Sequence, residues 1–293
     1  MSALRALLSG IVDYAGLYPP AALDMEAAVR NYDAYADGPL SWMLGRFVVG
    51  SSRLSELAKT EHAQSSSRGP IPLSVVLGSQ VDAEVASVHA FKSAHGDRFT
   101  IHSVEARFTT EEAIRSAAAL IDSEFELFAE LPIDEDPLPL VAAVARSGVS
   151  AKVRTGGVTV EAFPAPAHVV RFIRRCVEAK VRLKATAGLH HPLCSEYPLT
   201  YEASSPRGPL FGHLNVFLAA GFVSLGMSDA DALRVLLERD ASSITSSDAG
   251  ISWRGHVLST EQIECLRQNV AVSFGSCSFR EPVDELRALL LLS

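Results

Sequence analysis

Lysine and arginine side chains stand at the ends of two short β-rich segments in the middle of the chain. The first segment reads Ser-Ala-Lys-Val-Arg-Thr-Gly-Gly over 150–157 and carries Lys152 and Arg154. The second reads Val-Arg-Leu-Lys-Ala-Thr-Ala-Gly-Leu-His-His over 181–191 and carries Lys184. Buried parallel strands normally read as continuous Val, Ile and Leu, so cations at their ends predict a site.

A lysine inside such a fold has a specific chemistry. Burial among apolar groups, or a neighbour such as Arg154, lowers the pKa of the amine, and the neutral amine can attack a carbonyl to form a Schiff base. Glu105 or Glu130 could then move protons, or hold the lysine charged if the carboxylate lies too close. The alternative is a structural layer of ion pairs made by the same lysines, carboxylates and Arg154.

Alternating strands and helices must position these residues. Residues 167–179 have helical periodicity between the two lysine segments, which predicts a βαβ crossover. Strand-like segments recur along the chain at 10–18, 42–50, 71–77, 99–108, 125–131, 150–157, 181–191 and 270–274. They predict a single (β/α)8-barrel domain over 1–293, with a helical and loop insertion at 194–269 that covers the barrel mouth. An open doubly wound sheet is the alternative, but no Gly-x-Gly-x-x-Gly follows the first strand.

In a barrel of this kind the site lies at the carboxyl ends of the strands. The further candidates there are Asp13, Gly156, Gly157, Thr186, Gly275, Ser276 and Cys277. Side chains alternate along a strand, so Lys152 shares a face with Arg154 and Glu105 shares one with Arg107, but the sequence leaves the inward face open.

An anionic small molecule is the predicted substrate class. Residues 275–278 lead towards a helix N-terminus, where backbone N–H groups suit an anion, and Arg154 would reinforce this. Cys277 is either a nucleophile, if a base lowers its pKa, or a small packed residue. The glycines at 156 and 157 either admit a ligand close to the backbone or form a tight turn.

The two lysine segments resemble class I aldolases of the deoxyribose-phosphate aldolase type. That family carries Lys-Thr-Ser-Thr-Gly on strand six, Val-Lys-Ala-Ser-Gly-Gly on strand seven and a Gly-Thr-Ser-like turn on strand eight. This chain has Lys-Val-Arg-Thr-Gly from Lys152, Leu-Lys-Ala-Thr-Ala-Gly around Lys184, and Gly275-Ser276. The resemblance implies that Lys152 forms the Schiff base, that Lys184 tunes it, and that Gly275 and Ser276 bind a phosphate or carboxylate.

Histidines predict a rival mechanism. His190 and His191 follow the second lysine segment, and His213 opens a helix in the insertion. With Asp13, Glu105 or Glu130 they could hold a divalent metal ion that activates water or an enolate. No His-x-His or His-Glu-x-x-His spacing is present, and a histidine is more often a hydrogen-bonded loop residue.

Composition narrows the classes of partner. The net charge of -8, with both signs well mixed, argues against nucleic acid and anionic membranes as partners. No apolar run reaches the ~18 residues of a spanning helix. The start of the chain lacks a signal-peptide pattern, and four scattered cysteines predict free thiols, so a cytoplasmic location is expected. The sequence leaves open whether the protein forms a homo-oligomer.

The leading hypothesis is an aldolase-like lyase without a cofactor, which makes or breaks carbon–carbon bonds in a small anionic carbonyl compound. Its catalytic residues would be Lys152 or Lys184 as the amine, with Glu105 or Glu130 as the acid or base. The alternatives are a metal-dependent lyase or hydrolase that uses the histidines, and a non-catalytic barrel that binds an anionic ligand.

Overall fold

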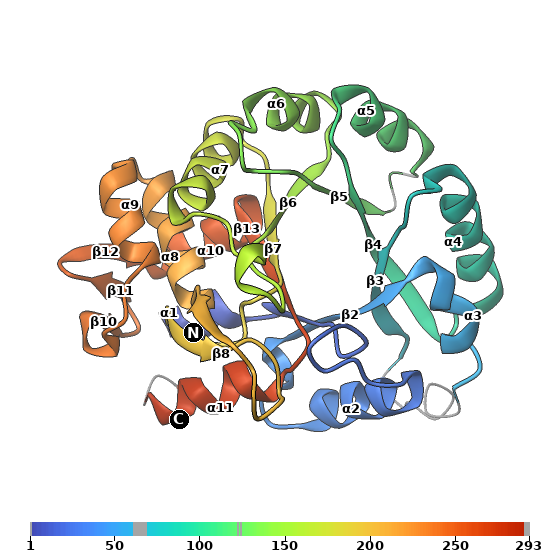
Figure 1. Ribbon diagram of the computed structural model, residues 1–293, viewed down its shortest axis with the longest axis horizontal. Coiled ribbons are helices and arrows are strands. Elements are labelled where there is room, and N and C mark those ends of the chain that lie inside the picture. The colour runs from blue at the N-terminus through green and yellow to red at the C-terminus, as the bar shows by residue number, and fades with distance from the viewer. Residues whose placement is uncertain (1, 61–68, 122, 124, 290–293) are drawn as a thin grey trace.

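The computed structural model describes residues 2–60, 69–121, 123 and 125–289. Its centre is a closed barrel of parallel strands in the order β1-β13-β7-β6-β5-β4-β3-β2 (Figure 1). These strands are β1 (Val12–Tyr14), β2 (Leu44–Gly50), β3 (Ile71–Val76), β4 (Phe99–Arg107), β5 (Glu126–Glu130), β6 (Ser150–Arg154), β7 (Leu183–Thr186) and β13 (Ala271–Ser276). The predicted (β/α)8 barrel is confirmed, and the open sheet is wrong because β1 pairs with both β2 and β13.

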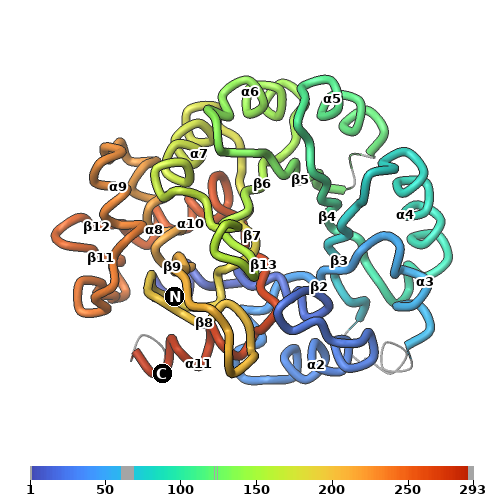
Figure 2. Tube along the Cα trace, viewed as in Figure 1, coloured from blue at the N-terminus to red at the C-terminus, as the bar shows by residue number. Residues whose placement is uncertain are grey.

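Helices between the strands form a ring around the barrel, as the chain trace shows (Figure 2). They are α2 (Met25–Asp37), α3 (Leu54–Leu57), α4 (Val81–His95), α5 (Glu111–Leu120), α6 (Leu138–Arg146), α7 (Pro166–Glu178), α8 (His213–Ser224) and α11 (Arg280–Ala288), with α1 (Ala3–Leu8) ahead of the first strand.

Helix α7 shows why the sequence folds in this way. Its apolar stripe, which includes Val169, Phe172 and Ile173, is fully buried against the barrel, while its arginines face outward. Pro166 stands in the first turn, where its missing N–H costs nothing. The predicted helix between the two lysine strands is therefore confirmed.

The two faces of the barrel strands differ in chemistry. Residues that face the helices are aliphatic or aromatic, as in β6, where Ala151 and Val153 are fully buried. The alternate residues point into the barrel, and among them Lys152 and Lys184 are charged. Barrel interiors are normally filled by branched apolar side chains, so charged side chains in the interior indicate a functional site.

The long connection between β7 and β13 is divided between two places. The hairpin β8 (Ser195–Pro198) and β9 (Arg207–Leu210) lies at the mouth, where the Tyr201 hydroxyl is 3.6 Å from the sulfur of Cys277. The remainder stands beside the barrel (Figure 1): α8, α9 (Asp229–Leu236), α10 (Thr260–Asn269) and the sheet of β10 (Ile244–Ser246), β11 (Gly250–Trp253) and β12 (His256–Ser259).

Apolar burial explains where this remainder lies. Helix α8 is buried on every side from His213 to Val223, so it must lie between the barrel and an outer layer. It contacts α7, α9, α10 and β13. The sequence predicts that the whole of 194–269 covers the mouth; in the structure the turn of the β8–β9 hairpin contacts Cys277 there, and α8, α9 and α10 stand beside the barrel.

In the described part of the chain, no helix combines the length and the apolar character that crossing a membrane would require.

Candidate active site

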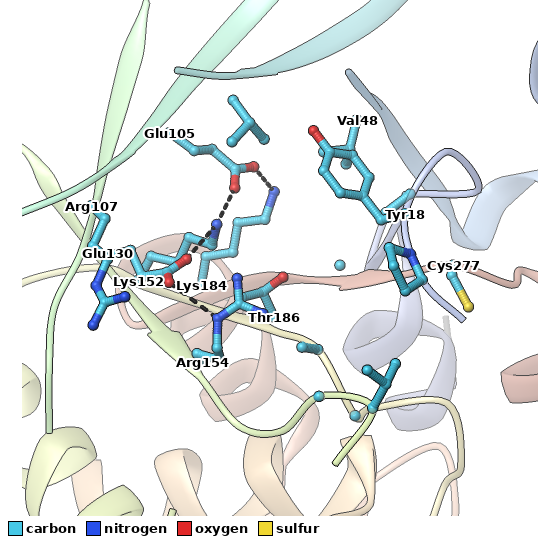
Figure 3. A pocket seen from close by; sticks show the side chains of 18 of the residues that line it. Tyr18, Val48, Glu105, Arg107, Glu130, Lys152, Arg154, Lys184, Thr186 and Cys277 are labelled. Atoms are coloured by element: carbon cyan, nitrogen blue, oxygen red, sulfur yellow. Dashed lines mark hydrogen bonds and ion pairs between the residues drawn. The ribbon is translucent and has the colours of Figure 1, made fainter. Parts of the chain in front are cut away.

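A cavity of about 520 Å³ opens at the carboxyl ends of the barrel strands. Its walls carry charged residues from four strands and apolar residues from the opposite side (Figure 3). The lining includes Tyr18, Val48, Val76, Glu105, Arg107, Glu130, Lys152, Arg154, Lys184 and Cys277. The inward parity that the sequence leaves open is thus the one that turns Lys152, Lys184 and Glu105 into the barrel.

Glu105 lies between the two lysines. Its Oε2 is 2.6 Å from Nζ of Lys152, and its Oε1 is 2.6 Å from Nζ of Lys184. Ser74 on β3 also donates a hydrogen bond of 2.6 Å to Oε1. Lys152 and Lys184 are register partners on adjacent strands, so a carboxylate from β4 across the barrel offsets their mutual repulsion.

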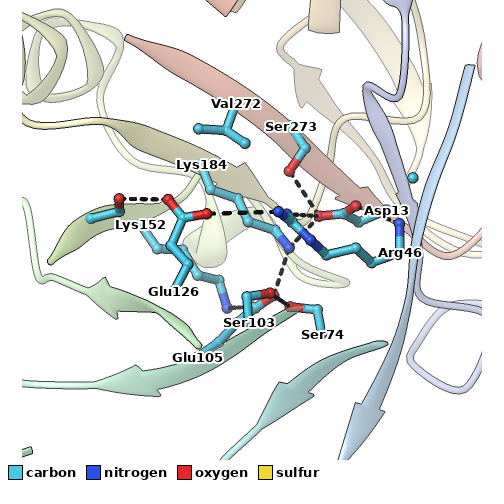
Figure 4. Close-up of polar contacts among 12 residues, drawn as sticks. Asp13, Arg46, Ser74, Ser103, Glu105, Glu126, Lys152, Lys184, Val272 and Ser273 are labelled. Carbon is cyan, nitrogen blue, oxygen red and sulfur yellow. Dashed lines mark hydrogen bonds and ion pairs between the residues drawn. The ribbon is translucent and has the colours of Figure 1, made fainter. Parts of the chain in front are cut away.

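Each lysine has a second carboxylate partner. Glu130 is 2.9 Å from Nζ of Lys152, and Asp13 is 2.5 Å from Nζ of Lys184 (Figures 3 and 4). Ser273 donates a further hydrogen bond of 2.7 Å to Asp13. The predicted candidates Asp13, Glu105, Glu130 and both lysines therefore form one network.

The network continues in both directions with alternating charge. At the mouth, Nε of Arg154 is 3.2 Å from Glu130. Towards the other end of the barrel, Arg46 lies 3.7 Å from Asp13 and 3.6 Å from Glu126 (Figure 4). Glu126 in turn is 3.0 Å from Arg182. Buried charges that are paired in this way cost much less than isolated ones.

The protonation of Lys152 differs from the sequence expectation. Burial alone would lower the pKa of this amine, but Glu105 and Glu130 outweigh burial, and the pKa is raised above its ordinary value of 10.5. The lowered pKa predicted from burial or Arg154 is therefore wrong, and the alternative, in which a close carboxylate holds the lysine charged, applies. Two carboxylates in direct contact favour the ammonium form more strongly than one nearby guanidinium disfavours it.

The carboxylates of the network are ionised at neutral pH. Burial would raise the pKa of Glu105, yet Lys152 and Lys184 hold it far below the usual value of 4.5. Lys152 and Arg154 likewise lower the pKa of Glu130, and Lys184 and Arg46 lower that of Asp13, each against the effect of burial.

The glycines after β6 make a tight turn. A Cβ at Gly156 would stand 2.4 Å from the ring of Phe163, and one at Gly157 would stand 2.7 Å from Ala162. Gly156 therefore serves packing within the protein, while Gly157 also lines the cavity. Thr186 and Gly275 meet on the cavity wall, where a Cβ on the glycine would lie 3.0 Å from the threonine hydroxyl.

In the turn after β13, the side chain of Ser276 is bonded within the protein. The Ser276 hydroxyl donates to the carbonyl of Ser278 at 2.6 Å and lies 3.1 Å from Nδ1 of His190. Glu281 is 3.6 Å from the same histidine nitrogen, which places a carboxylate beside the turn. An anion at Ser276 would have to displace these contacts and approach a negative charge.

Cys277 lines the cavity as a protonated thiol. Burial raises its pKa to about 11. His190 lies 3.7 Å from the sulfur, but burial, with a contribution from His191, lowers the pKa of His190 to about 4. The histidine is neutral and does not stabilise a thiolate. The structure therefore favours Cys277 as a small packed residue over Cys277 as a nucleophile.

The three histidines of the metal hypothesis face different partners. His191 contacts Glu285 at 2.6 Å and stacks on Tyr197, whereas His190 contacts Ser276. His213 is fully buried and stacks on Phe274. Within the described residues, no group of three or more His, Cys, Asp or Glu side chains has the geometry to hold a metal ion. The predicted His190, His191 and His213 site is therefore not assembled.

Tyr18 is the site residue that sequence reasoning missed. It lies in the loop after the first strand, just before the cis Pro19–Pro20 bond, and faces the lysines across the cavity (Figure 3). Its hydroxyl has no hydrogen-bond partner among the described residues. Burial, followed by the charge of Glu105, raises its pKa to about 12, so the phenol stays protonated. The signal was an aromatic residue with a polar tip at a strand end.

No protein-family model matches the chain, and no curated protein matches it. The interpretation of the site therefore depends on its residues and their geometry.

Proposed function

We propose that this protein is a lyase that makes or breaks a carbon–carbon bond next to a carbonyl group through a Schiff base on Lys152. One observation carries the proposal: the amine of Lys152 borders a cavity of substrate size and contacts two carboxylates there. The resemblance of residues 152–188 to class I aldolases supports the same chemistry.

Lys152 is the better nucleophile of the two lysines because it lies nearer the mouth. Its side chain keeps 6% exposure against 1% for Lys184, and its partner Glu130 connects it to the half-exposed Arg154. Lys184 lies deeper, above Asp13. We assign Lys184 to holding Glu105 in place and to opposing the positive charge on Lys152.

The reaction balances without an external oxidant or reductant. The neutral amine of Lys152 adds to the substrate carbonyl, and loss of water gives a cationic iminium. A hydroxyl on the β carbon of the substrate, two carbons from the carbonyl carbon, loses its proton and becomes a carbonyl, while the bond between the α and β carbons breaks. The bonding electrons pass to the iminium and form an enamine, which takes up a proton and is hydrolysed.

The carboxylates stabilise the charge of the iminium as they stabilise the charge of the ammonium ion. Both species carry one positive charge on the same nitrogen, so Glu105 and Glu130 still face a cation when the intermediate forms, and the single N–H of the iminium donates to one of them. Glu130 is the carboxylate nearer to solvent, at 8% exposure, and we assign to it the transfer of protons between Lys152 and the mouth.

The rate of adduct formation should rise with pH well above neutrality. Lys152 has a raised pKa, so the fraction of reactive amine grows about tenfold per pH unit until the pH reaches that pKa. The measurement is the rate at which borohydride traps a short aldehyde on the protein. The background rate, measured with the reactive lysine absent, is subtracted. A plateau at about pH 7–8 would instead indicate a lysine with a lowered pKa and would contradict the structure.

Replacing Tyr18 by phenylalanine should separate two steps of the reaction. The phenol is protonated and faces the site, so it can donate a proton to a substrate oxygen. We expect Tyr18→Phe to slow turnover by about a hundredfold, while the adduct on Lys152 still forms. Tyr201→Phe, at the hairpin, is the matched control. Unchanged turnover in Tyr18→Phe would remove Tyr18 from the mechanism.

A panel of short β-hydroxy aldehydes and β-hydroxy keto acids tests the proposed function directly. Wild-type protein should release a second carbonyl product from at least one of them, and Lys152→Met should release none. Cleavage that persists in Lys152→Met would contradict the Schiff base.

A non-catalytic barrel that binds an anionic ligand is the second candidate, and the completeness of the ion-pair network favours it. Every carboxylate that contacts the two lysines has a second cationic partner or a second lysine contact. Such a protein would be stabilised by its ligand, and its melting temperature would rise while the ligand remained intact. Product analysis of the same panel separates the two candidates.

A further inference from the structure

Two arginines line one side of the cavity mouth. Arg107 ends β4 and Arg154 ends β6, and both flank β5, whose last residue is Glu130. The strand register pairs Arg107 with Glu130, and Glu130 with Lys152. Figure 3 shows both guanidinium groups on the same side of the cavity as Lys152.

Both guanidinium groups keep N–H donors that no described residue of the protein binds. Arg154 is bonded to Glu130 through Nε, and its side chain is 53% exposed, so both terminal nitrogens remain available. Arg107 is exposed and has no hydrogen bond or ion pair with any described residue. In contrast, Arg46 and Arg182, at the other end of the barrel, are both paired with Glu126.

We propose that Arg107 and Arg154 form a subsite for the carboxylate or phosphate of the substrate. The proposal rests on the proposed function, because the subsite gains its meaning from the carbonyl that Lys152 would bind. A guanidinium presents parallel N–H donors that match the oxygens of both anions, and it remains charged at every physiological pH. The two arginines carry more positive charge than the carboxylate of Glu130 offsets, so this side of the cavity mouth is positive.

The position of the subsite restricts the substrate class. Arg154 and Lys152 contact the same carboxylate, so the anionic group must lie within a few atoms of the reacting carbonyl. Val48 and the phenol of Tyr18 line another part of the cavity, away from the two arginines. The substrate is therefore a short carbonyl compound with an anion at one end and an apolar or hydroxyl-bearing portion at the other.

Three matched probes test the subsite: glycolaldehyde, glyoxylate and glycolaldehyde phosphate, which carry no charge, a carboxylate and a phosphate. The measurement is the probe concentration that gives half-maximal borohydride trapping. In Arg107→Gln/Arg154→Gln this concentration should rise about tenfold or more for at least one anionic probe, and by less than about twofold for glycolaldehyde. The anionic probe that is affected identifies the class. Arg146→Gln, on the outer surface, is the matched control.

Two results would overturn the subsite. One is an unchanged preference for anionic probes in the double variant. The other is loss of that preference in Ser276→Ala, which would place the anion at the turn after β13.

A wild-type protein that traps none of the probes would count against the Schiff base, and the subsite would then be tested by itself. Calorimetry with inorganic phosphate and, separately, with acetate should show binding of at least one anion to the wild type and about tenfold weaker binding, or none, of that anion to the double variant. Absence of binding of both anions to the wild type, or equal binding to both proteins, would overturn the subsite.

Discussion

Glu105→Gln should destabilise the protein by about 3–5 kcal/mol, because the substitution removes the carboxylate that lies between two buried lysines. Lys152 would retain Glu130, and Lys184 would retain Asp13, but the two ammonium groups would face each other without the charge that separates them. Urea denaturation of wild type and variant measures the difference in the free energy of unfolding.

A matched substitution on the surface isolates the effect of burial. Glu111 pairs with Arg146 at 2.6 Å, but both side chains are half-exposed or more. We expect Glu111→Gln to change the free energy of unfolding by less than about 1 kcal/mol. If Glu105→Gln cost no more than this control, the barrel interior would be better hydrated than its burial indicates, and the network would not hold the site together.

Lys152→Met should abolish turnover, with a loss of about a thousandfold or more, while the fold is retained. The fold should be retained because each carboxylate that pairs with Lys152 also pairs with another cation. Glu105 keeps Lys184, and Glu130 keeps Arg154. The methionine also preserves the length of the side chain. Circular dichroism and the urea midpoint check the fold, and the cleavage panel checks the activity.

Lys184→Met should behave differently. Removing a positive charge beside Lys152 favours the ammonium form of Lys152, which raises its pKa and lowers the fraction of reactive amine. Adduct formation should therefore persist, but its pH profile should shift to higher pH. If Lys184→Met loses the adduct while Lys152→Met keeps it, the roles of the two lysines are reversed.

The sequence was sufficient to predict the barrel and the residues that meet in it. Strand periodicity located the eight strands, and the polar residues at their ends included Asp13, Glu105, Glu130 and both lysines. The sequence could not show which carboxylate touches which amine, because these contacts cross the barrel between strands far apart in the chain. The direction of the pKa shift of Lys152 depends on those contacts, and for this reason the sequence could not decide between a lowered pKa and a lysine held charged by a close carboxylate.

At the edges of the site, local sequence patterns do not show which side chains are already bonded within the protein. Gly275-Ser276 resembles an anion-binding turn, but the side chain of Ser276 is satisfied locally and Glu281 stands beside it. His190, His191 and His213 are close in sequence or in the same connection, yet their rings face different partners. Tyr18 was missed because it lies in a loop, where only the tertiary structure shows that its hydroxyl faces the lysines.

Identifying the trapped lysine in the wild-type protein tests the central claim most directly. The protein would be reduced with borohydride in the presence of each short aldehyde or keto acid, digested, and mapped by peptide mass spectrometry. We expect one stoichiometric adduct, on Lys152. An adduct distributed over surface lysines, or none above background with any probe, would contradict the Schiff-base site.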